Sequence, residues 1–152
     1  MPGRYFEDFA TGEVVDLGTA QLSEAEIVAF ARQYDPQYFH TDPQSAKQSI
    51  YGGLIASGWH TCVVYMRLFV ASVLGQAASL GSPGLEELRW LGPVRPGMLL
   101  RARYTVLETR ASESRPDRGI VRGLGEMLDE RGEVLMRLVS ANFISRRPPA
   151  GA

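Results

Sequence analysis

A long and strongly apolar helix is predicted near the middle of the chain, from Gly58 to about Leu74, with Ser57 as its N-cap. Its apolar residues fall on nearly every side: Val63, Val64, Met66, Leu68, Phe69, Val70, Val73 and Leu74. A helix of this kind must be buried on most of its sides. Because Arg67 interrupts the segment and it is too short to span a bilayer, the covering layer has to come from the protein itself.

The second half of the chain can supply that layer, because it has the pattern of a series of β-strands. Strands are expected at residues 85–90, 98–110, 119–129 and 134–145, with an earlier one at 14–20. The alternation of apolar and polar residues is clearest from Leu99 to Val106. Pro96-Gly97 marks the turn before the long strand, and Glu130-Arg131-Gly132 marks a hairpin between the last two.

Two further helices are expected before the apolar one. Ser23 and Glu26 form a capping box for a helix that runs to Tyr34, where Asp35-Pro36 ends it. Asp42-Pro43 is an N-cap followed by proline, which predicts a short helix through about Gln48. The segment between these two helices is expected to be irregular.

Helices followed by a run of strands indicate an α+β fold with an antiparallel sheet. One apolar helix and one long sheet predict that the sheet wraps around the helix, which is the hot-dog arrangement. Such a sheet leaves an edge strand and apolar surface that a second copy of the chain would cover. We therefore expect a homodimer or a dimer of dimers.

Length and composition limit the remaining possibilities. The 152 residues suit one domain, expected at residues 1–146, followed by a flexible tail at 147–152. With 16 basic and 17 acidic residues, no general field attracts nucleic acid or an anionic membrane. One cysteine, Cys62, and two histidines make a metal site unexpected. The acidic N-terminus does not resemble a signal peptide, so a cytoplasmic location is expected.

Asp35 and His40 are the main candidates for chemistry. They lie five residues apart between the two predicted helices, where the chain can fold back and direct both side chains into one space. An aspartate and a histidine together can orient and deprotonate a water molecule, and histidine titrates near neutral pH. The alternative is that Asp35 only ends a helix and His40 only packs.

Gly58 is a second candidate, because it lies near the start of the apolar helix. The backbone N–H groups there are unpaired, and the helix dipole is positive. A carbonyl oxygen placed at this point would be polarised. The alternative is that the glycine serves only conformation or close packing.

Three segments, in order, resemble the MaoC-like dehydratase family, which includes the (R)-specific enoyl-CoA hydratases. They are Asp35-Pro-Gln-Tyr-Phe-His40 with Asp42-Pro43, Gly52-Gly-Leu-Ile-Ala-Ser-Gly-Trp-His60, and Trp90-Leu-Gly-Pro-Val-Arg-Pro-Gly97. The family's signature is Asp-x-Asn-Pro-x-His, followed by a glycine at the start of the hot-dog helix. The similarity covers roughly residues 5–146.

The resemblance implies a hydratase that needs no separate cofactor. Asp35 and His40 would activate the water that adds to a trans-2-enoyl thioester, and would remove it again from a 3-hydroxyacyl thioester. Gly58, with Ser57, would bind the thioester oxygen. Coenzyme A or an acyl-carrier phosphopantetheine arm, as part of the substrate, would enter along the dimer interface.

Several residues depart from the family pattern or have an open role. Gln37-Tyr38 replaces Asn-Pro, and Ser57 replaces a histidine that is common before the helix glycine. Tyr38 is bulky enough to narrow the acyl pocket. The other possible pocket residues are Gly53, Trp59 and His60, for each of which a purely structural role is also open.

Two other functions stay open. The hot-dog fold also serves thioesterases, many of which carry a carboxylate on the central helix, but residues 59–80 contain neither Asp nor Glu. A non-catalytic acyl-thioester-binding module would keep the fold and lose the geometry of the pair.

Overall fold

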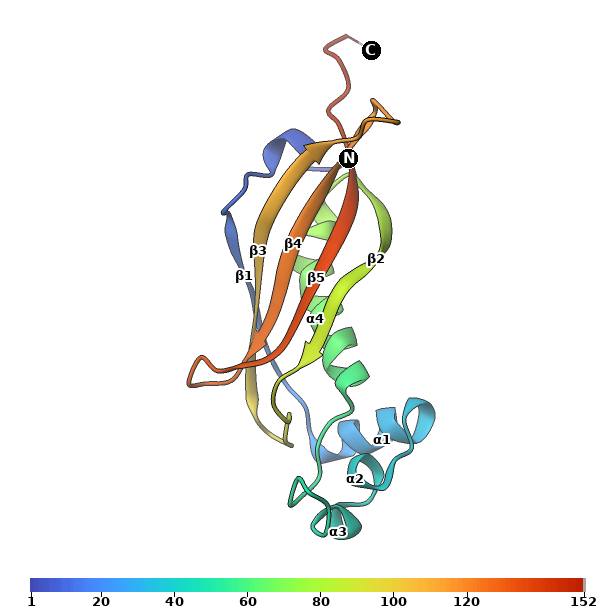
Figure 1. Ribbon diagram of the computed structural model, residues 1–152, viewed down its shortest axis with the longest axis vertical. Helices are drawn as coiled ribbons and strands as arrows, with labels where there is room; N and C mark the ends of the chain where they lie inside the picture. Colours follow the sequence, from blue (N-terminus) through green and yellow to red (C-terminus); the bar gives the residue numbers. More distant parts are fainter. Residues whose placement is uncertain (152) are drawn as a thin grey trace.

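The computed structural model describes residues 1–151 and contains one antiparallel sheet. Its five strands lie in the order β1-β3-β4-β5-β2. Their bounds are Val14–Gln21 (β1), Ser79–Trp90 (β2), Leu99–Ala111 (β3), Arg118–Leu128 (β4) and Val134–Ser145 (β5). The sheet curves over one side of the helix α4, Gly58–Ser72 (Figure 1). The predicted α+β hot-dog arrangement is confirmed, and β2 begins six residues earlier than expected.

The core lies between α4 and the concave face of the sheet. Four alternating residues of β3 are almost fully buried: Leu100, Ala102, Tyr104 and Val106. From α4, the Phe69 ring packs against Tyr104 at 4.6 Å between centroids. Tyr65 lies so close to β4 that a Cβ on Gly125 would be 2.2 Å from its hydroxyl oxygen. The inward-facing residues of the alternation predicted in β3 thus form part of the surface on which α4 packs.

One side of α4 is not covered by its own sheet. Trp59, Val63, Met66 and Val70 are between 40 and 55% exposed, although the helix was expected to be buried on most sides. The neighbouring edge strand β2 is also largely exposed, including Leu85. A contiguous apolar surface of this kind is typical of an interaction site.

Three short helices gather at one end of the molecule, next to the start of α4 (Figure 1). They are α1 (Glu24–Tyr34), α2 (Tyr38–Thr41) and α3 (Pro43–Ala46). The Ser23 cap is confirmed, since its Oγ accepts from the Glu26 N–H at 3.1 Å. Asp42 caps α3 as predicted, but α3 ends two residues before Gln48. The single turn α2 was not predicted, and the segment expected to be irregular is partly helical.

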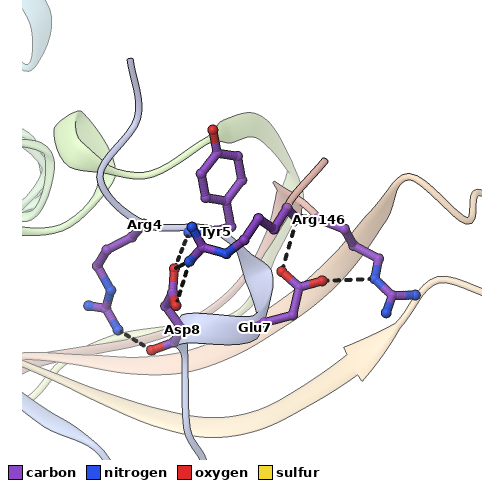
Figure 2. Close-up of polar contacts among 6 residues, drawn as sticks. Arg4, Tyr5, Glu7, Asp8 and Arg146 are labelled. Atoms are coloured by element: carbon purple, nitrogen blue, oxygen red, sulfur yellow. Dashed lines mark hydrogen bonds and ion pairs between the residues drawn. The ribbon is translucent and has the colours of Figure 1, made fainter. Parts of the chain in front are cut away.

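The first and the last described residues of the chain both lie toward the opposite end of the molecule (Figure 1). There the short 3-10 helix η1 (Phe6–Asp8) carries Glu7, which pairs with Arg146 at 3.0 Å, as Figure 2 shows. The predicted tail begins with Arg147, whose backbone N–H donates to Glu7 and whose side chain pairs with Asp8. Arg147 is therefore held in place, while Ala152 lies outside the described residues. The domain boundary at residue 146 stays a prediction.

None of the helices in the described part of the chain has both the length and the hydropathy that crossing a membrane requires.

Candidate active site

Asp35 and His40 are brought together by the turn that follows α1. Asp35 is the C-cap of that helix and its N–H donates to the Ala31 carbonyl at 2.8 Å. The chain then turns at Pro36 into α2, which carries His40. The Asp35 Oδ2 and His40 Nε2 atoms lie 3.3 Å apart. The two side chains therefore face each other, as expected if the chain folds back between the two helices.

His40 is buried and its orientation is fixed by the backbone. Its Nδ1 lies 2.8 Å from the carbonyl oxygen of Ile55. Because a carbonyl oxygen only accepts, Nδ1 must carry the hydrogen. Nε2 is then the atom that faces Asp35: it is an acceptor when the imidazole is neutral and donates to the carboxylate when the imidazole is protonated.

The segment that supplies the Ile55 carbonyl joins three parts of the site. Leu54, Ile55, Ala56 and Ser57 are all buried. The Ile55 N–H donates to the Phe39 carbonyl of α2 at 3.1 Å, and the Ala56 N–H donates to the Val94 carbonyl at 2.8 Å. These bonds hold α2 and the loop after β2 against the start of α4.

Asp35 accepts two further hydrogen bonds. Ser57 Oγ donates to Oδ2 at 2.7 Å, and Gln37 Nε2 donates to Oδ1 at 2.8 Å. Burial raises the pKa of Asp35, but the bonds from Ser57 and Gln37 and the nearby His40 outweigh it and hold the pKa below its usual value. Asp35 is therefore a carboxylate at neutral pH.

These contacts give the Ser57 side chain a place next to the pair, whereas its predicted role at the thioester oxygen stays a prediction. The residue is the N-cap of α4 by position, but its hydroxyl does not cap the helix and donates to Asp35 instead. It was expected beside the thioester. The role of Gln37 was missed, although its place two residues after Asp35 allows a side-chain bond back to the carboxylate.

Gly58 opens α4 and lines the pocket beside the pair. Within residues 1–151, the backbone N–H groups of Gly58 and Trp59 have no hydrogen-bond partner. A Cβ at position 58 would lie 2.3 Å from the ring of Trp90. A larger residue would have to displace that ring, so close packing requires the glycine, and the N–H groups are available as donors.

Asp35, His40 and Gly58 share a pocket of about 540 Å³. Its other lining residues are Gln37, Phe39, Tyr51, Ile55, Ala56, Trp59, Thr61, Trp90, Leu91, Gly92, Pro93, Val94 and Leu135. Trp59, one of the possible pocket residues, is among those that line this cavity. The sequence did not predict that Trp90 and the loop after it line the pocket. Only the fold brings the end of β2 beside α4.

Three of the possible pocket residues do not line this pocket. Tyr38 is half exposed, and so does not narrow it. Gly53 lies beside the Arg95 guanidinium. His60 stacks on Phe30 of α1 at 4.4 Å between ring centroids, and burial lowers its pKa. His60 therefore packs between two helices.

The part of the chain covered by the structure holds no group of three or more His, Cys, Asp or Glu side chains able to bind a metal ion. Cys62 is half-buried, with its Sγ 3.5 Å from Met136 Sδ, and burial raises the pKa of its thiol. It lies outside the pocket lining.

Comparison with known proteins places this geometry in a family. The crystal structure of a MaoC-like dehydratase from Rhodospirillum rubrum is 44% identical, with a TM-score of 0.89 over 96% of this chain and 99% of that one. The R-hydratase PhaJ1 of Pseudomonas aeruginosa has the same fold, at 20% identity and a TM-score of 0.76 over 97% and 96% of the two chains.

A curated relative and a family model extend the comparison. A mesaconyl-CoA hydratase of Haloarcula hispanica is 28% identical over 97% of this chain, which spans only 42% of that protein's length. The model of the MaoC like domain matches residues 8–122. With the hot-dog fold in place and the model matching most of its length, the chain belongs to the MaoC-like domain family.

Proposed function

We propose that the protein is an acyl-thioester hydro-lyase. It adds water to a trans-2-enoyl thioester, carried by coenzyme A or an acyl-carrier protein, and in reverse dehydrates the 3-hydroxyacyl thioester. The observation that carries the proposal is the Asp35–His40 pair, 3.3 Å apart in a pocket at the start of α4. The hydratases among its relatives support it.

In this proposal the pair holds and activates the reacting water. Asp35 is ionised and His40 presents Nε2, so both are acceptors for water protons. As the water oxygen bonds to the β-carbon, one of its protons passes to the pair and a proton is delivered to the α-carbon. Atoms and charge balance without any redox step, and the imidazole of His40 can both take up and release a proton.

The start of α4 stabilises the charge that develops on the thioester oxygen. The free N–H groups of Gly58 and Trp59 are donors at the positive end of the helix dipole. Donors that are fixed before reaction stabilise an enolate oxygen more than water does. Ser57 contributes indirectly, by holding the Asp35 carboxylate in place.

We further propose that the protein works in the cytoplasm as a homodimer or a dimer of dimers. The exposed apolar side of α4, with Trp59, Val63, Met66 and Val70, continues onto the edge strand β2. A second copy would bury this surface and pair the edge. The phosphopantetheine arm of the substrate would then enter along the interface.

The proposal is tested by incubating the purified protein with crotonyl-CoA and following the loss of enoyl-thioester absorbance. We expect turnover, and we expect His40→Ala to lower kcat/KM by about 100- to 1000-fold with the melting temperature nearly unchanged. Release of free thiol would instead indicate a thioesterase. Binding without turnover across short, medium and branched enoyl thioesters would indicate a binding module and contradict the proposal.

A further inference from the structure

Most of the side chains that line the pocket are apolar; the polar ones are Asp35, Gln37, His40 and Thr61. Among the apolar lining residues are Phe39, Tyr51, Trp59 and Trp90. Aliphatic side chains line the pocket as well: Ile55, Ala56, Leu91, Pro93, Val94 and Leu135. Such a surface favours a hydrocarbon group by burying its apolar area.

The charged group in this wall is an acid. Asp35 is ionised at neutral pH, because its hydrogen bonds outweigh the effect of burial on its pKa. No Lys or Arg of residues 1–151 lines the pocket. Arg95 lies behind the wall, where its Nη2 donates to the Tyr51 carbonyl at 2.6 Å.

From this lining we infer that the acyl group is an uncharged hydrocarbon, and that the protein discriminates against acyl groups with a second carboxylate. The inference rests on the proposed function and names its substrate class. A second carboxylate in the pocket would lose its hydration and face Asp35 without a cationic partner. A hydrocarbon of the same length has neither penalty.

The inference separates this chain from one of its relatives. The mesaconyl group carries a free carboxylate, and a hydratase that takes mesaconyl-CoA has to accommodate that charge. The pocket described here presents aromatic and aliphatic side chains and the like charge of Asp35. Membership of the same family therefore does not imply that this protein takes mesaconyl-CoA as its substrate.

A binding experiment tests the inference independently of turnover. Butyryl-CoA and succinyl-CoA are saturated four-carbon thioesters that differ by a terminal carboxylate. By calorimetry, the butyryl thioester should bind at least about tenfold more tightly. Asp35→Asn should narrow that difference, because it removes the repelling charge. Equal or tighter binding of succinyl-CoA would overturn the inference.

Turnover gives the second test. Crotonyl-CoA should exceed mesaconyl-CoA in kcat/KM by on the order of 100-fold. Leu91→Arg puts a cation on the pocket rim, where Leu91 is more than half exposed, and should reduce that ratio about tenfold. Leu91→Gln, without the charge, and Ile50→Arg, with the charge outside the lining, should leave the ratio unchanged.

The outcomes separate the two proposals. If neither enoyl thioester is hydrated but butyryl-CoA is still preferred, the hydratase proposal fails and the inferred ligand preference stands. If crotonyl-CoA is hydrated and mesaconyl-CoA is hydrated equally well, the hydratase proposal stands and the inference is wrong.

Discussion

Two clusters of charged residues lie at opposite ends of the molecule, and the pocket described above adjoins one of them. At one end Asp35 and His40 lie where α1, α2 and the start of α4 meet (Figure 1). At the other, the terminal cluster joins η1 to the end of the chain (Figure 2). Its members are Arg4, Glu7, Asp8, Glu13, Arg146 and Arg147.

The pKa values of Glu7 and Asp8 in the terminal cluster and of Asp35 in the site are all lowered, so this property does not distinguish the two clusters. At Asp8 the backbone N–H of Tyr5 has the largest effect, and the charge of Arg147 adds to it. At Asp35 the hydrogen bonds of two neutral side chains, Ser57 and Gln37, overcome the effect of burial. The environment differs: the Asp35 side chain is 18% exposed and His40 6%, whereas Arg147 is 54% exposed.

The difference between the two clusters shows which surroundings make a carboxylate and its partner a candidate site. Exposed arginines neutralise Asp8 and Glu7 and are screened by salt. Asp35 keeps its charge while facing a cavity of about 540 Å³, and its partner His40 can exchange a proton. Burial, neutral hydrogen-bond donors and an adjoining cavity distinguish the candidate site from the terminal cluster, and the residue types alone do not.

The largest effect is expected from matched substitutions at the two ends. Asp35→Asn keeps the shape of the side chain and removes the carboxylate, so kcat/KM for crotonyl-CoA should fall on the order of 1000-fold. Asp8→Asn makes the same change in the terminal cluster and should leave kcat/KM unchanged. Similar losses in both variants, at equal folded fraction by circular dichroism, would remove the distinction between the clusters.

Gly58→Ala should have the next largest effect, because its Cβ meets the Trp90 ring. Overpacking of this kind costs about 1–3 kcal/mol of unfolding free energy. Displacement of the ring should also lower kcat/KM about tenfold or more, since moving catalytic groups by about 1 Å strongly reduces the rate. Denaturant unfolding and kinetics measure the two effects. In the Gly58→Ala/Trp90→Ala double variant, stability loss should be less than additive; full additivity would contradict the contact.

Ser57→Ala should shift the pH dependence of the reaction. The Ser57 hydroxyl lowers the pKa of Asp35, so without it this pKa rises. Activity that needs the carboxylate is lost as pH falls through that pKa, so the acidic limb of kcat/KM should move to higher pH. At neutral pH, loss of the positioning bond should cost about tenfold.

The control for Ser57→Ala is Ser45→Ala, which removes an exposed hydroxyl that donates to Asp42 at 2.6 Å. The pH profile of that variant should match the parent. An unmoved acidic limb in Ser57→Ala would mean that the hydroxyl does not act on the reacting carboxylate.

The smallest effect is expected from Arg147→Ala in the terminal cluster. Exposed ion pairs contribute little to stability, so the melting temperature should fall by about 2 °C or less. The difference from the parent should shrink at high salt, and crotonyl-CoA turnover should not change. Differential scanning calorimetry at low and high salt measures this difference in melting temperature. A decrease that does not depend on salt would show that the cluster stabilises the protein by packing.

Much of the fold could be predicted because it depends on local pattern. The Ser23 and Asp42 caps, the alternation in β3 and the apolar residues of α4 each act over a few neighbouring positions. Asp35 and His40 could be singled out because they are close in sequence. The helix α2 was missed, since a single turn has too few residues to show a periodicity.

The rest of the candidate site depends on residues far apart in the chain. Ser57 reaches Asp35 across 22 positions, and Trp90 meets Gly58 across the end of the sheet. Tyr38 and His60 were considered as pocket residues because they neighbour the motifs, but α2 and α4 direct them elsewhere. Neighbourhood in sequence does not determine the side of a helix on which a residue lies.

The amino-acid sequence by itself determined most of the helices and strands of this protein, their order and the pair of side chains proposed to activate water, because caps, periodicity and residue chemistry are local properties. Only the tertiary structure decided which oxygen of Asp35 faces His40, which neutral groups hold it and which rings form the wall. Those contacts exist only once α1, α2, α4 and the end of β2 have packed together, and the energy of a buried charge depends on everything that surrounds it.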